Sequence, residues 1–441
     1  MKRVFYLTAV LGVWLCNATA FAQQVPDSLL SQATLQNCIQ YALSHQPVVK
    51  QSKIDQEITE YSIKSKLADW YPQIGLDFNL QHYLKLPTSY FNGNAITTGV
   101  ANSSSAAFSL NQNIFTRDLL LAGRTAKDVR TQARQNTQSN QIDVVSNVSK
   151  AYYDMLLTQK QVEVLNEDIV RLERSLKDAY NQYQGGIVDK TDYKRATISL
   201  NNTKAQKKTG EETLVAKYAY LKQLMGYPVN GQLKLVYDTM KMAQEVQLDT
   251  NVSVAYETRI EYQLLQTQRS LLAAELKYNK WSFFPTVSAF VNYNFMYLHP
   301  EFSKLYNHNY PNSLVGLQLS LPIFQGSKRL HNIKQAELQL KRSDWDVEAL
   351  KSQINTEYTQ AMSAYKSNLN EYIVLKENMD LAKEVYDLIE LQYREGIKAY
   401  LEVITAQTDL RAAQLNYYNA MYTVLSSKID LERALGTITT N

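Results

Sequence analysis

The chain alternates between short stretches with a hydrophobic period of two and very long stretches with a helical period. Neither Gly nor Pro occurs between Gly123 and Gly185, or between Gly326 and Gly396. Helices of this length far exceed the usual 11–12 residues, and at about 1.5 Å per residue each would extend for about 90–100 Å. Rods of this length do not fit into a compact domain. The pattern therefore predicts an elongated, mainly helical molecule.

The helical stretch after Gly396 carries two stripes with a seven-residue period. A sustained heptad is typical of coiled-coil packing, and two stripes on one helix indicate two neighbouring helices. The alternative is an amphipathic helix in an ordinary four-helix bundle, against which the length argues. The larger residues of the first stripe are Val403, Leu410, Tyr417, Val424 and Leu431, and the small residues of the second are Ala399, Ala406, Ala413, Ala420 and Ser427.

Four segments alternate between apolar and polar residues and are predicted to be β-strands, near 73–84, 106–115, 286–297 and 314–324. About 9–11 alternating residues is the length of a strand that crosses a membrane, with its apolar side facing lipid and its polar side facing inward. The intervening segments 82–106 and 298–313 are rich in Asn, Ser, Tyr and Gly, as expected of exposed loops.

Four strands in one chain cannot close a barrel in a membrane. An open strand edge in lipid leaves backbone groups without hydrogen bonds, at several kcal/mol each, and the smallest membrane barrels have about eight strands. Several copies must therefore contribute strands to one closed, cyclic assembly. Two, three or four copies would satisfy this requirement, and only the larger rings would leave a water-filled lumen.

The two halves of the chain are internal repeats about 210 residues apart. Tyr183-x-x-Gly186 returns as Tyr393-x-x-Gly396, and Gly226 returns as Gly436. Each repeat would contain a helix, two strands and a long helical hairpin. In the first repeat the opening helix (about 35–71) and the helix after the turn would stack end to end along the long helix. We expect a signal peptide at 1–22, repeats at 23–226 and 255–441, and a linking collar midway along the rod at 227–254.

Composition places the protein outside the cytoplasm. Lys2 and Arg3, the apolar run 4–15 and Ala20-Phe21-Ala22 together have the form of a secretory signal peptide. Beyond this leader Cys38 is the only cysteine, so no internal disulfide is expected. The formal net charge of +4, part of it in the leader, gives no basic surface for nucleic acid. No later segment is apolar for the roughly 20 residues of a membrane helix.

No group of residues indicates an enzyme, a metal site or a cofactor. The segment Asp189-Lys190-Thr191 is similar to an aspartyl-phosphate site, but Asp192 stands where that site needs Gly. No Gly-x-Ser-x-Gly or phosphate-binding loop occurs. The five histidines have no metal-ligand spacing: His45, His82, His299, His308 and His331.

The turns at Gly186 and Gly396 would join antiparallel helices at the end farthest from the strands. Asp192 and Glu402 fall in the first two turns of the following helices, where an acid gains ~0.3–1 kcal/mol from the helix dipole. Simple capping would explain them. In a ring of copies, however, the same acids would form a ring that selects cations, and hydrogen bonds between chains could hold the pore shut. The residues concerned are Tyr183, Asp192, Tyr393, Lys398 and Glu402.

The chain resembles the TolC-like outer-membrane efflux family over nearly all of its length after the leader. The resemblance rests on the opening segment 35–43, the prolines that precede two predicted strands (Pro72 and Pro285), the segment Pro322-Ile323-Phe324, the two Tyr-x-x-Gly hairpins and the terminal segment 431–436.

This resemblance implies a homotrimer with a twelve-stranded β-barrel in the outer membrane of a Gram-negative bacterium, and a long α-helical barrel crossing the periplasm. The assembly would be a passive exit duct for efflux or for type I secretion. The hairpin tips, at Gly185, Gly186 and Gly396, would dock a periplasmic adaptor protein that links the duct to an inner-membrane transporter. The alternative is a non-conducting coiled-coil protein with a structural or adhesive role at the surface, which would not need lipid-type strands.

The resemblance also implies a periplasmic gate held by bonds between neighbouring hairpins. Its partners match Thr191 and Asp192 on the first hairpin, and Tyr393 and Lys398 on the second, with Lys398 in place of an Arg. Of the family's two constriction acids, spaced three residues apart, Glu402 matches the first. Thr405 replaces the second, so we expect weaker block of the pore by cations.

Overall fold

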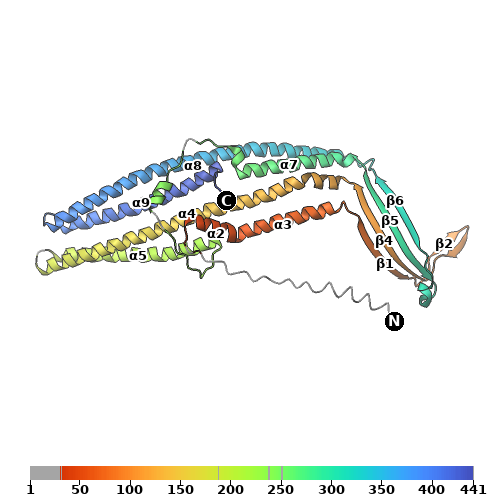
Figure 1. Cartoon of the computed structure of the whole chain (residues 1–441), viewed down its shortest axis with the longest axis horizontal. Coiled ribbons are helices and arrows are strands. Elements are labelled where there is room, and N and C mark those ends of the chain that lie inside the picture. The colour runs from red at the N-terminus through yellow and green to blue at the C-terminus, as the bar shows by residue number, and fades with distance from the viewer. Residues whose placement is uncertain (1–29, 31, 187, 237–238, 250–251, 441) are drawn as a thin grey trace.

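The computed structural model describes residue 30 and residues 32–186, 188–236, 239–249 and 252–440. The predicted signal peptide lies outside these residues. The protein is elongated, with a β-sheet at one end and two helical hairpin turns at the other (Figure 1). Among the described helices, none combines the length and the apolar character needed to cross a membrane.

In each repeat, one very long helix is covered by shorter helices that follow each other along it, three in the first repeat and two in the second (Figure 1). Helix α4 also packs against α7 and α9, which joins the two repeats side by side. The first repeat contains α2 (Leu35–His45), α3 (Pro47–Ala68), α4 (Arg117–Gln184) and α5 (Lys190–Met225), and the second contains α7 (Ile260–Lys280), α8 (Lys328–Arg394) and α9 (Tyr400–Leu435).

The single opening helix expected at 35–71 is wrong, because the chain breaks between α2 and α3. Gln46 has an extended ψ of 124°, and Pro47 begins α3. Proline disfavours the helical conformation in the residue before it. Gly226, which ends α5 with a φ of 66°, lies directly against this break: a Cβ on Gly226 would come within 2.8 Å of the His45 carbonyl oxygen. A glycine at this position therefore allows the end of α5 to contact the break between α2 and α3 closely.

Its counterpart in the second repeat makes the equivalent contact. Gly436 ends α9 with a φ of 71°, and a Cβ there would lie 2.9 Å from the Thr258 hydroxyl oxygen. Thr258 closes the short helix η1 (Tyr256–Thr258), immediately before α7. Both helix ends therefore abut the start of the helix that continues their line along the rod.

The first heptad stripe of α9 is buried throughout, and the second is buried in part, because Ala399 is an exposed N-cap residue before α9 and Ala413 is half-buried. All five residues of the first stripe are at most 8% exposed, and Ala406, Ala420 and Ser427 of the second stripe are also buried. Helix α9 contacts both α8 and α4, which are the two neighbours that two stripes require.

A four-stranded antiparallel sheet in the order β1-β4-β5-β6 forms the other end of the molecule. Ile74, Leu110, Val291 and Val315 lie in one row across one face. Asp77, Ala107, Asn294 and Asn312 form a row on the opposite face. The strands are β1 (Gln73–His82), β4 (Asn102–Phe115), β5 (Thr286–His299) and β6 (Asn312–Ser320).

Several predicted boundaries are wrong. Strand β1 stops two residues early, at His82, and β5 continues two residues further, to His299. Strand β4 starts four residues early, at Asn102. Strand β6 ends at Ser320 instead of near 324, because Pro322 has no N–H with which to continue the ladder.

The predicted exposed loop 82–106 contains a missed β-hairpin, β2 (Thr88–Phe91) and β3 (Asn94–Thr97). Asn92 and Gly93 form its turn with positive φ angles of 51° and 80°. This is the conformation that Asn-Gly favours in two-residue hairpin turns. The second loop contains the short helix η3 (Phe302–Asn307). Its Leu305 is buried.

The main hydrophobic cluster lies midway along the molecule, where α2, α4 and α9 meet the segment that contains α6 (Thr239–Glu245). Polar contacts fix this segment to the rods. The Tyr365 hydroxyl donates to the Val246 carbonyl at 2.8 Å, and the Tyr152 hydroxyl donates to the Val236 carbonyl at 3.0 Å. The segment therefore packs as part of the rod and not as a free linker.

Candidate gate at the hairpin ends

The two hairpin turns have nearly identical backbones. The φ angles of Gly186 and Gly396 are 72° and 73°, and each amide donates to the tyrosine carbonyl three residues earlier, Tyr183 or Tyr393, at 3.0 Å. A positive φ strains any residue with a Cβ. Apart from the adjacent residues in the chain, no atom of the described residues lies within 4 Å of a Cβ built on either glycine. Backbone conformation alone thus explains these glycines.

In the first hairpin, Asp189 and not Asp192 caps the helix. The Asp189 carboxylate accepts a hydrogen bond from the Thr191 amide at 3.1 Å and occupies the N-cap of α5. Asp192 lies in the first turn. Within the described part of the chain, its carboxylate has no hydrogen bond or ion pair. Capping therefore does not require Asp192, and its charge is available to another molecule.

In the second hairpin, Lys398 pairs with Glu402. Its Nζ lies 2.6 Å from Glu402 Oε2, and the two side chains are 38% and 42% exposed. The resemblance led us to expect Lys398 to bond to a neighbouring hairpin. Within one chain, Lys398 lies in the turn before α9 and pairs with Glu402 in the first turn of that helix. The adjacent Thr405 hydroxyl donates to the Leu401 carbonyl at 2.9 Å.

Tyr393 connects the two hairpins of one chain. Its hydroxyl donates to Gln182 Oε1 at 3.0 Å. Burial raises the pKa of Tyr393, so this group is a neutral donor over the physiological range. Tyr400 packs beside it, against the buried Ala179 and Ala196. The structure thus places Tyr393, Lys398 and Glu402 close together on one hairpin, and Thr191 and Asp192 on the other. No contact between Asp192 and Lys398 occurs within the chain as described.

Sequence reasoning missed a buried polar cluster farther along the hairpins, which we call the Asp168 network. Asp168 of α4 is 1% exposed. Its carboxylate accepts hydrogen bonds from Gln407 Nε2 at 2.8 Å and from Arg411 Nη1 at 3.1 Å, both on α9. Arg411 also donates to the Thr203 hydroxyl of α5 at 2.6 Å. One carboxylate therefore joins three helices of both hairpins.

A signal for this network was present in the sequence. Asp168 stands between the buried Leu165 and Leu172, and Gln407 stands between Val403 and Leu410, each at three- and four-residue spacing. Polar residues at such core positions of a coiled coil commonly fix register. The partners belong to helices some 240 residues apart in the chain, and only the folded structure brings them together.

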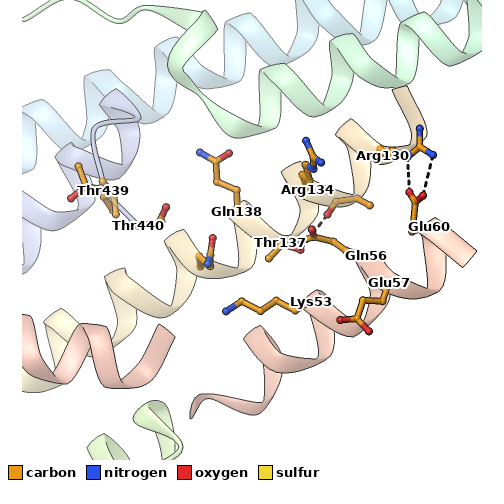
Figure 2. A pocket seen from close by; sticks show the side chains of 13 residues that line it. Lys53, Gln56, Glu57, Glu60, Arg130, Arg134, Thr137, Gln138, Thr439 and Thr440 are labelled. Atoms are coloured by element: carbon orange, nitrogen blue, oxygen red, sulfur yellow. Dashed lines mark hydrogen bonds and ion pairs between the residues drawn. The ribbon is translucent and has the colours of Figure 1, made fainter. Parts of the chain in front are cut away.

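A cleft lies between α3, α4 and the C-terminal segment, with a volume of about 1170 Å³ (Figure 2). Glu60 and Arg130 form an ion pair across it, with Arg130 Nη2 3.1 Å from Glu60 Oε1. Lys53, Glu57 and Arg134 also line it. The cleft is far from the hairpin turns and contains no nucleophile paired with a base. Among the described residues, no group of His, Cys, Asp or Glu is arranged to hold a metal ion.

Sequence comparison relates the chain to outer-membrane efflux proteins. The family model for outer membrane efflux proteins matches residues 38–227 and 262–437. The outer membrane protein TolC of Escherichia coli is 23% identical over 432 residues, covering 93% of this chain and 84% of TolC. A probable efflux pump outer membrane protein of Pseudomonas putida, TtgC, is 22% identical over 318 residues, covering 69% of this chain and 62% of TtgC.

Solved structures show the same fold. CusC matches with a TM-score of 0.76 at 18% identity, covering 92% of this chain and 93% of CusC. The outer membrane protein VceC of Vibrio cholerae matches with a TM-score of 0.72 at 14% identity, covering 91% and 96%. The fold is that of an outer-membrane channel, and members of this family form channels and are not enzymes. The chain belongs to the outer membrane efflux protein family.

Proposed function

We propose that three copies of this chain form one closed duct, with twelve strands in the outer membrane and a helical barrel in the periplasm, gated at the hairpin ends. The protein is an outer-membrane efflux protein that extends into the periplasm. The observation that carries the proposal is the sheet. It has one apolar face, one polar face and two strand edges, β1 and β6, that pair on one side only among the described strands.

Pairing of β1 with β6 of a neighbouring copy would satisfy both edges and close the ring. An exposed stripe on α8 supports a head-to-tail contact along the rods as well. Val374, Leu381 and Leu388 recur every seven residues and are 45%, 51% and 55% exposed. In a ring, a helix of the next copy would cover this stripe. The repeats at 23–226 and 255–441, with the collar at 227–254, would then form one sixfold layer of similar units.

For the gate, we propose that Asp192 of one copy accepts bonds from the second hairpin of its neighbour. Its carboxylate has no partner among the described residues of the single chain, and Tyr393 and Lys398 of the second hairpin offer donors. The Tyr393 hydroxyl would have to exchange Gln182 for Asp192. Lys398 would have to exchange Glu402 for Asp192 on assembly. In the open duct Lys398 would again form an ion pair with Glu402. This pairing would reduce the net negative charge of the ring that the Glu402 side chains form.

The partners follow from this arrangement. A periplasmic adaptor would dock at the tips marked by Gly185, Gly186 and Gly396, and an inner-membrane transporter would connect through that adaptor. Two further relatives from Pseudomonas putida, each 22% identical over 318 residues, are named as outer membrane proteins of a toluene efflux pump and of an antibiotic efflux pump. For this chain we propose the shared role of a passive duct, in efflux or type I secretion, with the cargo chosen by the transporter.

Single-channel recording in planar lipid bilayers tests the duct and the gate together. We expect steps of one size, and a larger open probability in the Asp192→Asn/Lys398→Gln double variant, because bonds between copies are lost. Glu402→Gln should reduce the preference for cations. Glu395→Gln is the matched control, since Glu395 is an exposed acid at the same turn.

Silence of both the wild type and the double variant, in protein that is folded and oligomeric, would contradict the duct. It would favour the non-conducting surface rod. Unchanged cation selectivity in Glu402→Gln would remove Glu402 from the constriction while leaving the duct in place.

A further inference from the structure

Apolar side chains continue past the ends of the strands into the junction with the rods. Phe283 ends the short helix η2 (Trp281–Phe283) just before β5, and Ile323 follows the end of β6. Ile323 and the adjacent Phe324 are 88% and 85% exposed. An exposed aromatic and aliphatic border at the end of a lipid-type face is expected where a membrane meets water.

Arg329 is held against this border. Its guanidinium lies 4.6 Å from the centre of the Phe283 ring, and it donates to the carbonyl oxygens of Ile323 at 3.0 Å and of Ser282 at 3.3 Å. Lys328 beside it is exposed. Within the described part of the chain, neither side chain forms an ion pair with a carboxylate. The guanidinium is thus fixed in position while its charge has no partner.

The other elements at the junction also offer little negative charge. Asp69 pairs with Lys66 at 3.6 Å, and Asp118 accepts the Tyr278 hydroxyl at 2.8 Å. Arg124 stacks over Trp281 at 4.7 Å. Next to the apolar border, cationic side chains therefore outnumber the carboxylates that lack a hydrogen-bond or ion-pair partner among the described residues. That combination matches an amphiphile with an anionic head and an apolar tail.

A neighbouring copy is a poorer match for this surface. Ring closure uses the backbone groups at the outer edges of β1 and β6, in the plane of the sheet. Phe283 lies just before β5, which pairs with a strand of the same chain on both sides. The stack of Arg329 on Phe283 therefore adjoins an inner strand, and not the backbone edge that a copy would pair.

We propose that Phe283, Ile323, Phe324, Lys328 and Arg329, which we call the junction belt, bind an anionic phospholipid of the periplasmic leaflet of the outer membrane. Arg329 and Lys328 would hold the lipid phosphate, and the acyl chains would lie over the apolar face. The inference rests on the proposed function, because it requires the sheet to cross the outer membrane. It would fix the depth at which the duct sits in the membrane.

Native mass spectrometry of the assembled, full-length protein tests the belt. The protein is titrated with phosphatidylglycerol or with zwitterionic phosphatidylcholine of the same acyl chains. We expect the wild type to retain phosphatidylglycerol preferentially. One cation near a lipid surface contributes about fivefold in affinity. Arg329→Gln and Lys328→Gln should each therefore weaken phosphatidylglycerol binding about fivefold, with phosphatidylcholine unchanged.

Arg342→Gln is the matched control, because Arg342 is an exposed arginine farther along the same helix. Lys328→Gln guards against misfolding, since the exposed Lys328 side chain makes no hydrogen bond among the described residues, and its backbone bond to the Gln325 carbonyl is unaffected by the substitution. Equal retention of the two lipids by the wild type would overturn the inference. The inference would also be overturned if both variants bound phosphatidylglycerol as strongly as the Arg342→Gln control does. Bilayer conductance measured on the same samples separates this failure from failure of the duct itself.

Discussion

At the scale of the residue, two glycines with similar free space around them should respond in opposite ways to alanine, because their backbone conformations differ. Gly186 needs a positive φ, whereas Gly123 lies inside α4, and neither would place a Cβ within 4 Å of another atom. Gly186→Ala should lower stability by about 1 kcal/mol. Gly123→Ala should raise it by about 0.5–1 kcal/mol, because glycine weakens a helix interior. Thermal unfolding midpoints in detergent should shift in opposite directions; a shift of the same sign would contradict the conformational argument.

Burial of one carboxylate gives a prediction for pH. Burial raises the pKa of Glu432, and Lys428 only partly offsets this. A raised pKa means that the folded protein favours the protonated acid, so stability is lost as pH rises from below the ordinary carboxyl pKa through the raised value. Glu432→Gln should therefore raise the unfolding midpoint at pH 7 and have little effect near pH 4.

The matched control for Glu432 is Glu212, whose pKa is lowered by its hydrogen bond with Lys208. The sign is then reversed: the stabilisation is present above the ordinary carboxyl pKa and is lost as pH falls through the lowered value. Glu212→Gln should not stabilise the protein at pH 7. Equal gains in both variants would show that titration of Glu432 is not the cause.

At the scale of the element, the Asp168 network determines how firmly the two hairpins are joined. Asp168→Asn keeps the shape but leaves Arg411, 15% exposed, without a carboxylate. Loss of one partner of a buried pair costs roughly 3–5 kcal/mol. The control is Glu173→Gln, which removes an ion pair with Lys204 between the same helices α4 and α5, but with both side chains about half exposed.

Such an exposed pair contributes about 1 kcal/mol or less. Hydrogen exchange of the α4, α5 and α9 segments would measure the difference. We expect faster exchange at and beyond the network in Asp168→Asn, and little change in Glu173→Gln. Equal exchange in the two variants would mean that the network does not join the hairpins.

At the scale of the whole molecule, the two faces of the sheet should respond differently to the same charge. Leu317 belongs to the apolar face and is 74% exposed in the single chain, and Gln318 points to the opposite face. An arginine on a lipid face costs about 2–4 kcal/mol near the bilayer centre. Leu317→Arg should therefore reduce the amount of assembled protein recovered from outer membranes, and Gln318→Arg should not. Equal recovery would contradict membrane insertion of this sheet.

The sequence and the structure agree best where a pattern is local. The heptad on α9, the alternation along β1 and the paired Tyr-x-x-Gly turns each depend on residues within a few positions of one another. Predicted boundaries differ from the structure where a proline interrupts an element, as at Pro47 after Gln46 and at Pro322, two residues after Ser320. The β2–β3 hairpin lies in a segment with the polar composition of a loop, and the Asn92-Gly93 pair is the motif that predicts its turn.

Periodicity and repeated motifs can be read along the chain, so they are sufficient to predict the elongated form, the four alternating strands, the repeat and the family. Which side chains contact one another follows from the packing of the folded molecule. The Asp168 carboxylate accepts hydrogen bonds from Gln407 and Arg411 of the other hairpin. Lys398 forms an ion pair with Glu402, and the Arg329 guanidinium stacks on the Phe283 ring. These contacts join residues on different elements or select one of several possible partners. They depend on how helices pack side by side, and a one-dimensional pattern does not contain that information.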